Sequence, residues 1–217
     1  MMLWMTLTGS LGMLLQAVVR ERTNRALETL LAAAQPWEIV YGKLVGVGGV
    51  SLLVLVAWLG SSAGLTALAP NAGGALAPFF QILGQPALLA YAAVLYVSAF
   101  LLFGLITVAV GAAAADTAAA QNLSRPMFAV LLAVFFAAMA ATSGAADRLS
   151  WLVFVPPFTP FMLLLKTHSA QTQILAFALM GGAIFVAGRI AVRGLGLKAN
   201  ARPFSCPTLR RSKPIPL

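Results

Sequence analysis

Cysteine, histidine and charge are all scarce in this sequence. It holds one cysteine, Cys206, and one histidine, His168. One cysteine cannot form a disulfide within the chain, and these two residues cannot supply a His/Cys metal cluster. Charged residues make up 9% of the 217 residues, against about 25% in soluble domains. These scarcities exclude a disulfide-stabilised domain and a His/Cys metal centre, and they argue against a soluble fold.

Apolar residues, by contrast, make up 61% of the chain. No charged side chain occurs between Lys43 and Asp116, which leaves room for two or three spans of about 20 residues. Stretch 127–141 is apolar on every face, whereas the strands of a membrane barrel alternate apolar and polar residues. We therefore predict an all-α, polytopic membrane helical bundle. Five transmembrane helices are expected, at about 1–19, 44–68, 86–109, 127–145 and 173–191.

Lys and Arg are distributed unequally between the two sets of loops. Twelve of the 14 lie in 20–43, in 110–126, or from residue 189 onward, while Arg148 and Lys166 lie in the other set. The positive-inside rule then places the carboxyl terminus in the cytoplasm and the amino terminus outside. Because the net charge of +9 lies at span ends without an aromatic-basic stripe, nucleic acid is not an expected partner.

One dense mixed-charge stretch, VVRERTNRALETLLAAAQPWEIVYGK (18–43), interrupts the apolar runs. Leu27, Leu30, Leu31 and Ala34 form an apolar stripe at helical spacing, and Glu21, Arg25 and Glu28 form a charged one. The pattern predicts an amphipathic helix at about 20–34 that ends before Pro36.

Two interpretations of this helix stay open. It could lie on the inner leaflet, although acidic residues gain nothing from an anionic membrane. It could instead dock on a protein partner, where complementary charges set the register.

The segment VVRERTNRALETLLAAAQPWEIVYGKLVGVGGV resembles the signature of ABC transporter permeases of the second exporter class, closest to the group with sodium-extruding exporters. Segments 115–126 (ADTAAAQNLSRP) and 154–166 (FVPPFTPFMLLLK) resemble two further family segments, so the resemblance covers most of a 1–198 permease domain. The matching positions of the first segment are Glu21, Arg22, Arg25, Glu28, Leu30, Leu31, Pro36, Gly42 and Lys43. The family often has Glu-Glu-Lys or Glu-Lys where this chain has Arg20, Glu21 and Arg22.

The resemblance implies a permease subunit of an ATP-driven exporter in the bacterial inner membrane, moving an ion or small molecule such as sodium or a drug-like compound. The chain has no G-x-x-x-x-G-K-[ST] motif, so it is expected to be no enzyme and to hold no cofactor. ATP would be bound by a separate cytoplasmic ABC ATPase, and a second permease copy or a homologous permease would complete the transporter. The implied ATPase-docking residues are Arg20, Glu21, Arg22, Arg25, Glu28, Leu30, Leu31, Gly42 and Lys43.

Two departures from the family leave a further interpretation open. The family has one more span and an outer domain before the first span found here, so the chain could be the second part of a longer protein or a truncated, non-functional fragment. A reverse anchor would also explain an outside amino terminus. The tail at 199–217 is rich in Pro and Arg and is expected to be disordered.

Two features outside the charged stretch could line a pathway. Pro156, Pro157 and Pro160 break any helix in the outer segment, which predicts either two short re-entrant pieces near the pathway exit or a plain loop. Asp116 is an acid at the end of a span, where a helix cap is favoured over an ion site.

Small-residue spacing predicts close helix approach. Gly42 and Gly46 are four residues apart, as are Gly60 and Gly64, and such pairs favour packing within one chain or at a subunit interface.

Two other function classes fit the sequence less well. A secondary transporter or channel places charged or broken-helix sites near mid-membrane, and spans 44–68 and 86–109 have neither. An intramembrane serine protease needs a base beside Ser10, and His168 lies in the outer segment.

Overall fold

The computed structural model describes residues 2–23, 34–68, 86–114, 116–145, 147–166 and 168–200. Within these ranges all regular structure is helical, which confirms the predicted all-α membrane bundle. The long helices are α1 (Met2–Thr23), α3 (Pro36–Leu68), α5 (Pro86–Ala113), α6 (Thr117–Ala140) and α8 (Ala170–Asn200). Between α6 and α8 lie a π-helical turn, η2 (Ala141–Ala145), a 3₁₀ helix, η3 (Ser150–Phe154), and the short helix α7 (Thr159–Leu165).

Four helices of the described residues, α3, α5, α6 and α8, are long and apolar enough to cross a membrane. The chain is therefore a multi-pass membrane protein. Helix α1, which the sequence predicts as a fifth span, is not among the four. Its 22 residues would reach across a bilayer, but it carries Thr6, Thr8, Ser10 and Gln16 among its apolar residues. The fifth span stays a prediction.

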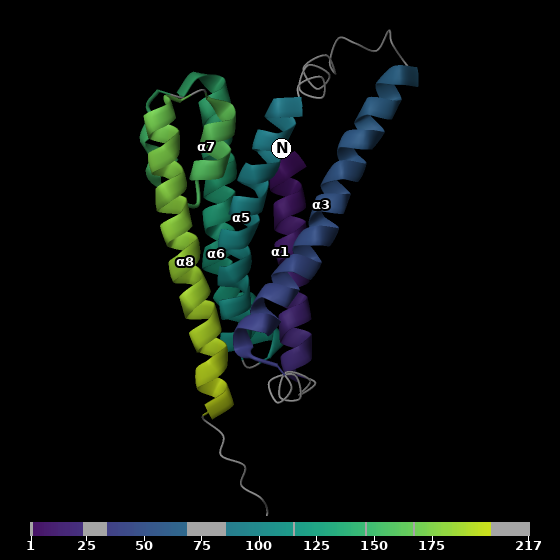
Figure 1. Cartoon of the computed structure of the whole chain (residues 1–217), viewed down its shortest axis with the longest axis vertical. Coiled ribbons are helices and arrows are strands. Elements are labelled where there is room, and N and C mark those ends of the chain that lie inside the picture. The colour runs from purple at the N-terminus through teal and green to yellow at the C-terminus, as the bar shows by residue number, and fades with distance from the viewer. Residues whose placement is uncertain are drawn as a thin grey trace, which may run out of the picture.

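The long helices run in alternating directions (Figure 1), so basic residues collect at one end of the bundle. The end of α1, the start of α3, the α5–α6 connection and the end of α8 share that end, which carries Arg20, Lys43, Arg125 and Arg193. We call it the basic end. Arg148 and Lys166 lie in the segment at the opposite end. The two groups are those on which the predicted orientation rests, and cytoplasmic placement of the basic end remains a prediction.

Helix α1 packs against α3, α5 and α6, and α5 packs against α1, α3, α6, α7 and α8. Leu7, Leu11, Leu14 and Val18 follow one another at helical spacing and are at most 1% exposed. At the other end of α1 the indole N–H of Trp4 donates to the backbone oxygen of Leu131 in α6, with an N–O distance of 2.8 Å. The stripe of large apolar side chains therefore buries one face of α1 against α3, α5 and α6, while α8 packs mainly on α5.

Close approach between helices depends on three glycines that the spacing argument did not select. A Cβ atom on Gly48 would lie 2.9 Å from the Phe100 ring, and one on Gly111 would lie 2.8 Å from Val18. A Cβ atom on Gly104 would lie 2.6 Å from the Leu44 side chain. These contacts join α3 to α5 and α5 to α1.

The prediction that Gly42, Gly46 and Gly60 allow close packing within the chain is wrong. A Cβ atom on any of them would meet no described atom within 4 Å. The side-chain surroundings of Gly64 lie outside the described residues. A subunit interface at these glycines stays a prediction.

Several helices extend beyond the predicted spans. Helix α3 begins at Pro36 rather than near 44, and α6 begins at Thr117 rather than near 127. Pro126 therefore lies inside α6, where it removes one backbone donor without ending the helix. Helix α8 continues to Asn200, while the rest of the predicted disordered tail lies outside the described residues.

Candidate functional site

The basic end contains an ion pair between two long helices. Lys43 Nζ lies in α3 and donates a hydrogen bond to Glu21 Oε2 in the last turn of α1. The Lys43 side chain is 14% exposed and that of Glu21 is 33% exposed, so both are shielded from solvent. The pair joins the two helices that flank the predicted docking segment. It therefore fixes the distance between the points where that segment leaves α1 and enters α3.

The start of α3 is held by its own side chains. The Gln35 N–H donates to Glu38 Oε2 at 2.8 Å, and Trp37 Nε1 donates to Gln35 Oε1 at 2.8 Å. Pro36 occupies the first helical position, where its missing N–H costs nothing because that donor would have no helical partner. Sequence and capping thus define where the docking segment ends and α3 begins.

The structure places only part of the predicted docking set. Arg20, Glu21 and Arg22 lie in the last turns of α1, because that helix continues without a break to Thr23. The sequence predicted a separate helix beginning at residue 20, and this prediction is wrong at that boundary because residues 20–23 belong to α1. Gly42 and Lys43 lie two turns into α3. The predicted docking residues Arg25, Glu28, Leu30 and Leu31 lie outside the described residues.

The pairing of Glu21 with Lys43 was missed from the sequence. Both residues were predicted to contact a partner, whereas each contacts the other within the chain. The sequence does place opposite charges on either side of the point where the chain reverses direction, and this pattern could have indicated the ion pair. The docking role of the whole predicted set stays a prediction.

A second polar link, also missed from the sequence, joins α1, α3 and α5 in the apolar core. Ser10 Oγ lies 2.7 Å from Ser51 Oγ, and Ser51 Oγ is hydrogen-bonded to the Tyr96 hydroxyl. All three residues are at most 3% exposed. Ser10 Oγ is also 2.7 Å from the Thr6 carbonyl oxygen.

The single hydroxyl proton of Ser10 has two acceptors within reach, Ser51 Oγ and the Thr6 carbonyl oxygen. In the bond between Ser51 and Tyr96 either hydroxyl can be the donor. Ser10 is thus held by hydroxyl and carbonyl partners. His168, the base that a serine protease would need, lies just before α8, where its carbonyl oxygen accepts from Gln173.

The predicted pathway prolines lie where two short helical pieces, η3 and α7, meet at the end opposite the basic one. Pro156 and Pro157 are half-buried in the turn between η3 and α7, and Pro160 is buried near the start of α7. Thr159 donates its hydroxyl to the Val153 oxygen at 2.8 Å, which ties the two pieces together. The segment holds two short helices rather than a plain loop. That these pieces are re-entrant and lie at a pathway exit stays a prediction.

Asp116 is the N-cap of α6. Its Oδ1 accepts the Ala119 N–H at 2.7 Å, and the residue is exposed. The cap that the sequence favoured is confirmed. Capping α6 explains why an acidic residue occurs here, and no ion site is needed to explain it.

A second ion pair lies at the opposite end of the bundle, where Lys166 Nζ donates to Asp147 Oδ1. Both side chains are exposed, Asp147 by 89%. The hydrogen bond and the charge of Lys166 lower the pKa of Asp147 below its usual value. The pair therefore forms fully above the ordinary carboxyl pKa and is lost only as pH falls through the lowered pKa.

One known protein family matches nearly the whole of the described helical bundle. A family described as ABC-2 family transporter protein matches residues 1–193, which include α1, α3, α5, α6, α7 and most of α8. No curated protein and no solved structure matches the chain.

Proposed function

Because this chain belongs to the ABC-2 family of transporter proteins and is a permease component of an ABC transporter, we propose that it couples ATP hydrolysis by a separate subunit to export. ATP binds to a cytoplasmic ABC ATPase, and the 20–34 segment docks on that ATPase. A second permease copy, or a homologous permease, faces this one across the pathway. The chain itself supplies the membrane helices and the docking segment.

The ion pair of Glu21 and Lys43 is the observation that supports coupling. It joins α1 to α3 on either side of the docking segment. A displacement of that segment by a closing ATPase then acts on both helices together, because the pair resists their separation. A segment with an independent hinge on each side could move without moving either helix.

The orientation follows from the charges at the two ends. The basic end lies in the cytoplasm of a bacterial cell, with the carboxyl terminus on the same side, as the positive-inside rule requires. The docking segment is at this end and so faces a cytoplasmic partner. The segment with η3 and α7 then lies at the outer end, where Pro156, Pro157 and Pro160 lie near the pathway exit.

The substrate class is an ion or a small molecule. Sodium is the ion suggested by the resemblance of segment 18–50 to sodium-extruding exporters, and drug-like compounds are the second class. The docking residues between the two members of the ion pair, Arg25, Glu28, Leu30 and Leu31, contact the ATPase in either case.

Purification of the tagged chain in mild detergent, with mass spectrometry of the proteins that accompany it, tests this proposal. We expect a P-loop ATPase to be recovered with the unmodified chain and to be lost in the Glu28→Lys variant. Asp147→Lys is the matched control, since it reverses a charge in an exposed residue at the opposite end of the bundle. It should retain the ATPase.

The contrary result is equally specific. A well-folded chain that is recovered without any ATPase contradicts the coupling proposal and leaves a transporter without ATPase or a non-functional fragment. If the Glu28→Lys variant recovers as much ATPase as the unmodified chain, the ATPase remains the partner, but docking through the 20–34 segment is contradicted.

A further inference from the structure

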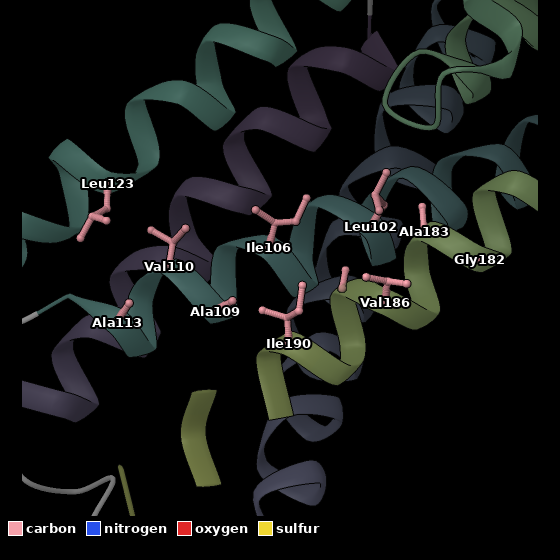
Figure 2. A pocket seen from close by; sticks show the side chains of 11 residues that line it. Leu102, Ile106, Ala109, Val110, Ala113, Leu123, Gly182, Ala183, Val186 and Ile190 are labelled. Carbon is pink, nitrogen blue, oxygen red and sulfur yellow. The ribbon is translucent and has the colours of Figure 1, made fainter. Parts of the chain in front are cut away.

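A groove of about 610 Å³ runs along the line where α5 and α8 meet (Figure 2). Every side chain that lines it is apolar, so it offers a ligand neither charge nor a hydrogen-bonding side chain. Its walls come from α5 and α8, with one residue from α6. The lining residues are Leu102, Ile106, Ala109, Val110, Ala113, Leu123, Gly182, Ala183, Val186, Ala187 and Ile190.

Small residues on α8 leave the groove unfilled. Gly182, Ala183 and Ala187 line the α8 wall, and a Cβ atom on Gly182 would meet no described atom within 4 Å. Val186 and Ile190 are 56% and 58% exposed, so the groove opens to the outside of the bundle. Both α5 and α8 are candidate membrane spans, and the opening therefore faces lipid.

The length and depth of the groove match one leaflet. Its α5 wall runs from Leu102 to Ala113, a rise of about 16 Å at 1.5 Å per residue. That is about half of a hydrocarbon core about 30 Å thick. The α5 wall ends at Ala113, where the candidate span of α5 also ends, at the basic end. The groove therefore spans the leaflet at the basic end.

Arg193 lies at the interfacial end of the groove. It follows Val186 by seven residues and Ile190 by three, which places it on the same face of α8, one turn beyond the last lining residue. The residue is exposed and makes no hydrogen bond or ion pair within the part of the chain that the structure describes. A guanidinium there lies at the depth of the headgroups and can bind a phosphate through two N–H groups.

We propose that this groove binds one acyl chain of an anionic phospholipid from the leaflet at the basic end, with the headgroup phosphate on Arg193. An acyl chain gains little free energy by moving from surrounding lipid to an apolar wall, since lipid tails are as apolar as leucine. The selection of an anionic headgroup therefore comes from Arg193. The inference does not depend on ATP coupling.

Retention of phospholipid by the full chain tests the groove. The protein is reconstituted in nanodiscs of phosphatidylglycerol and phosphatidylethanolamine in equal amounts, moved to mild detergent, and analysed by native mass spectrometry. Gly182→Leu places a side chain in the groove and should remove most of the retained phospholipid. Gly181→Leu is the matched control: it makes the same change at the neighbouring position, which also has open space but does not line the groove, and should retain the lipid.

A second pair of variants tests the headgroup without altering the groove. Arg193→Gln should lower the preference for phosphatidylglycerol over phosphatidylethanolamine about fivefold, the effect of one basic side chain at an anionic surface. Arg125→Gln removes an equal charge at the same end and should leave the preference unchanged. Arg125 lies two residues from the groove residue Leu123 and so points to another side of α6.

Three results would overturn the proposal. One is equal lipid retention by the two glycine variants. Another is an unaltered headgroup preference in Arg193→Gln. The third is conversion of a dimer to a monomer by Gly182→Leu with unchanged lipid retention, which would show that a second copy of the chain fills the groove.

Discussion

The two halves of α3 are both rich in apolar residues but have different surroundings. In the half nearer the basic end, Val40, Leu44 and Ser51 are at most 2% exposed. In the far half, Val56 and Trp58 are 63% and 55% exposed. Figure 1 shows the far half leaning away from the other helices. Apolar residues are abundant in both halves, so apolarity alone does not determine which half packs.

The near half differs in having specific partners. Lys43 pairs with Glu21, Gly48 receives the Phe100 ring, and Ser51 bonds to Tyr96. In lipid the hydrophobic effect gives little preference for one apolar neighbour over another, and polar or close contacts determine association. Helix α3 is therefore fixed at the end that follows the predicted docking segment.

Among the charged and polar contacts of α3, breaking the ion pair has the largest expected effect. Lys43→Met leaves the shielded Glu21 carboxylate without a partner and should lower the free energy of unfolding by about 2–3 kcal/mol. Titration with a denaturing detergent, followed by circular dichroism, measures this. Exchanging the charges, with Glu21→Lys and Lys43→Glu together, should recover most of the loss. A double variant as unstable as the sum of the single ones would show that the pair contributes nothing.

A smaller effect is expected at the hydroxyl link of the near half. Ser51→Ala removes the partner of the buried Tyr96 hydroxyl and should cost about 1–2 kcal/mol in unfolding free energy. The same detergent titration applies, with Tyr96→Phe and the double variant completing a cycle. Ser61→Ala is the control in the far half, where the hydroxyl is exposed and bonds only to its own helix. Additive losses in the cycle would contradict a shared hydrogen bond.

Two neighbouring glycines of the near half, Gly48 and Gly49, differ in whether α5 lies against them. Gly48→Ala brings a methyl group against the Phe100 ring and should be about 1 kcal/mol less stable than Gly49→Ala. A Cβ atom on Gly49 meets nothing within 4 Å, and both substitutions raise helix propensity equally. Equal unfolding midpoints for the two variants would show that α3 and α5 are farther apart than the structure places them.

The smallest effect is expected in the far half. Val56→Ala should change the free energy of unfolding by no more than about 0.5 kcal/mol, because that side chain contacts no neighbouring helix closely enough to be buried. Leu44→Ala, in the near half, should cost about 2–5 kcal/mol as a core truncation. A loss at Val56 as large as that at Leu44 would remove the distinction between the halves.

The sequence predicts the membrane helices well because their apolar runs are long. The span predicted at about 86–109 lies within α5 (Pro86–Ala113), and Asp116 is the cap predicted before α6. The same apolarity conceals which face packs, since a helix that is apolar all round has no amphipathic stripe to orient it. For this reason Gly48 could not be distinguished from Gly42 by sequence spacing.

The candidate site could be located from sequence but not assembled from it. Charge density selected the 20–43 stretch, and resemblance assigned its role. The contact between Glu21 and Lys43 depends on where α1 ends and α3 begins, and both boundaries differ from the predicted ones. The link among Ser10, Ser51 and Tyr96 joins residues from three helices whose relative rotation no local pattern specifies.

The bond between Trp4 and Leu131 has a consequence for biosynthesis. These residues are separated by 127 positions, so α1 leaves the ribosome well before its partner helix α6 exists. The hydroxyl partners of Ser10 are likewise contributed in part by later helices. Because α1 is also the long helix that composition leaves outside the four apolar spans, its stable placement follows the insertion of helices made after it. The first long helix of this sequence to be synthesised therefore gains its bond to Leu131 only after α6 has been made.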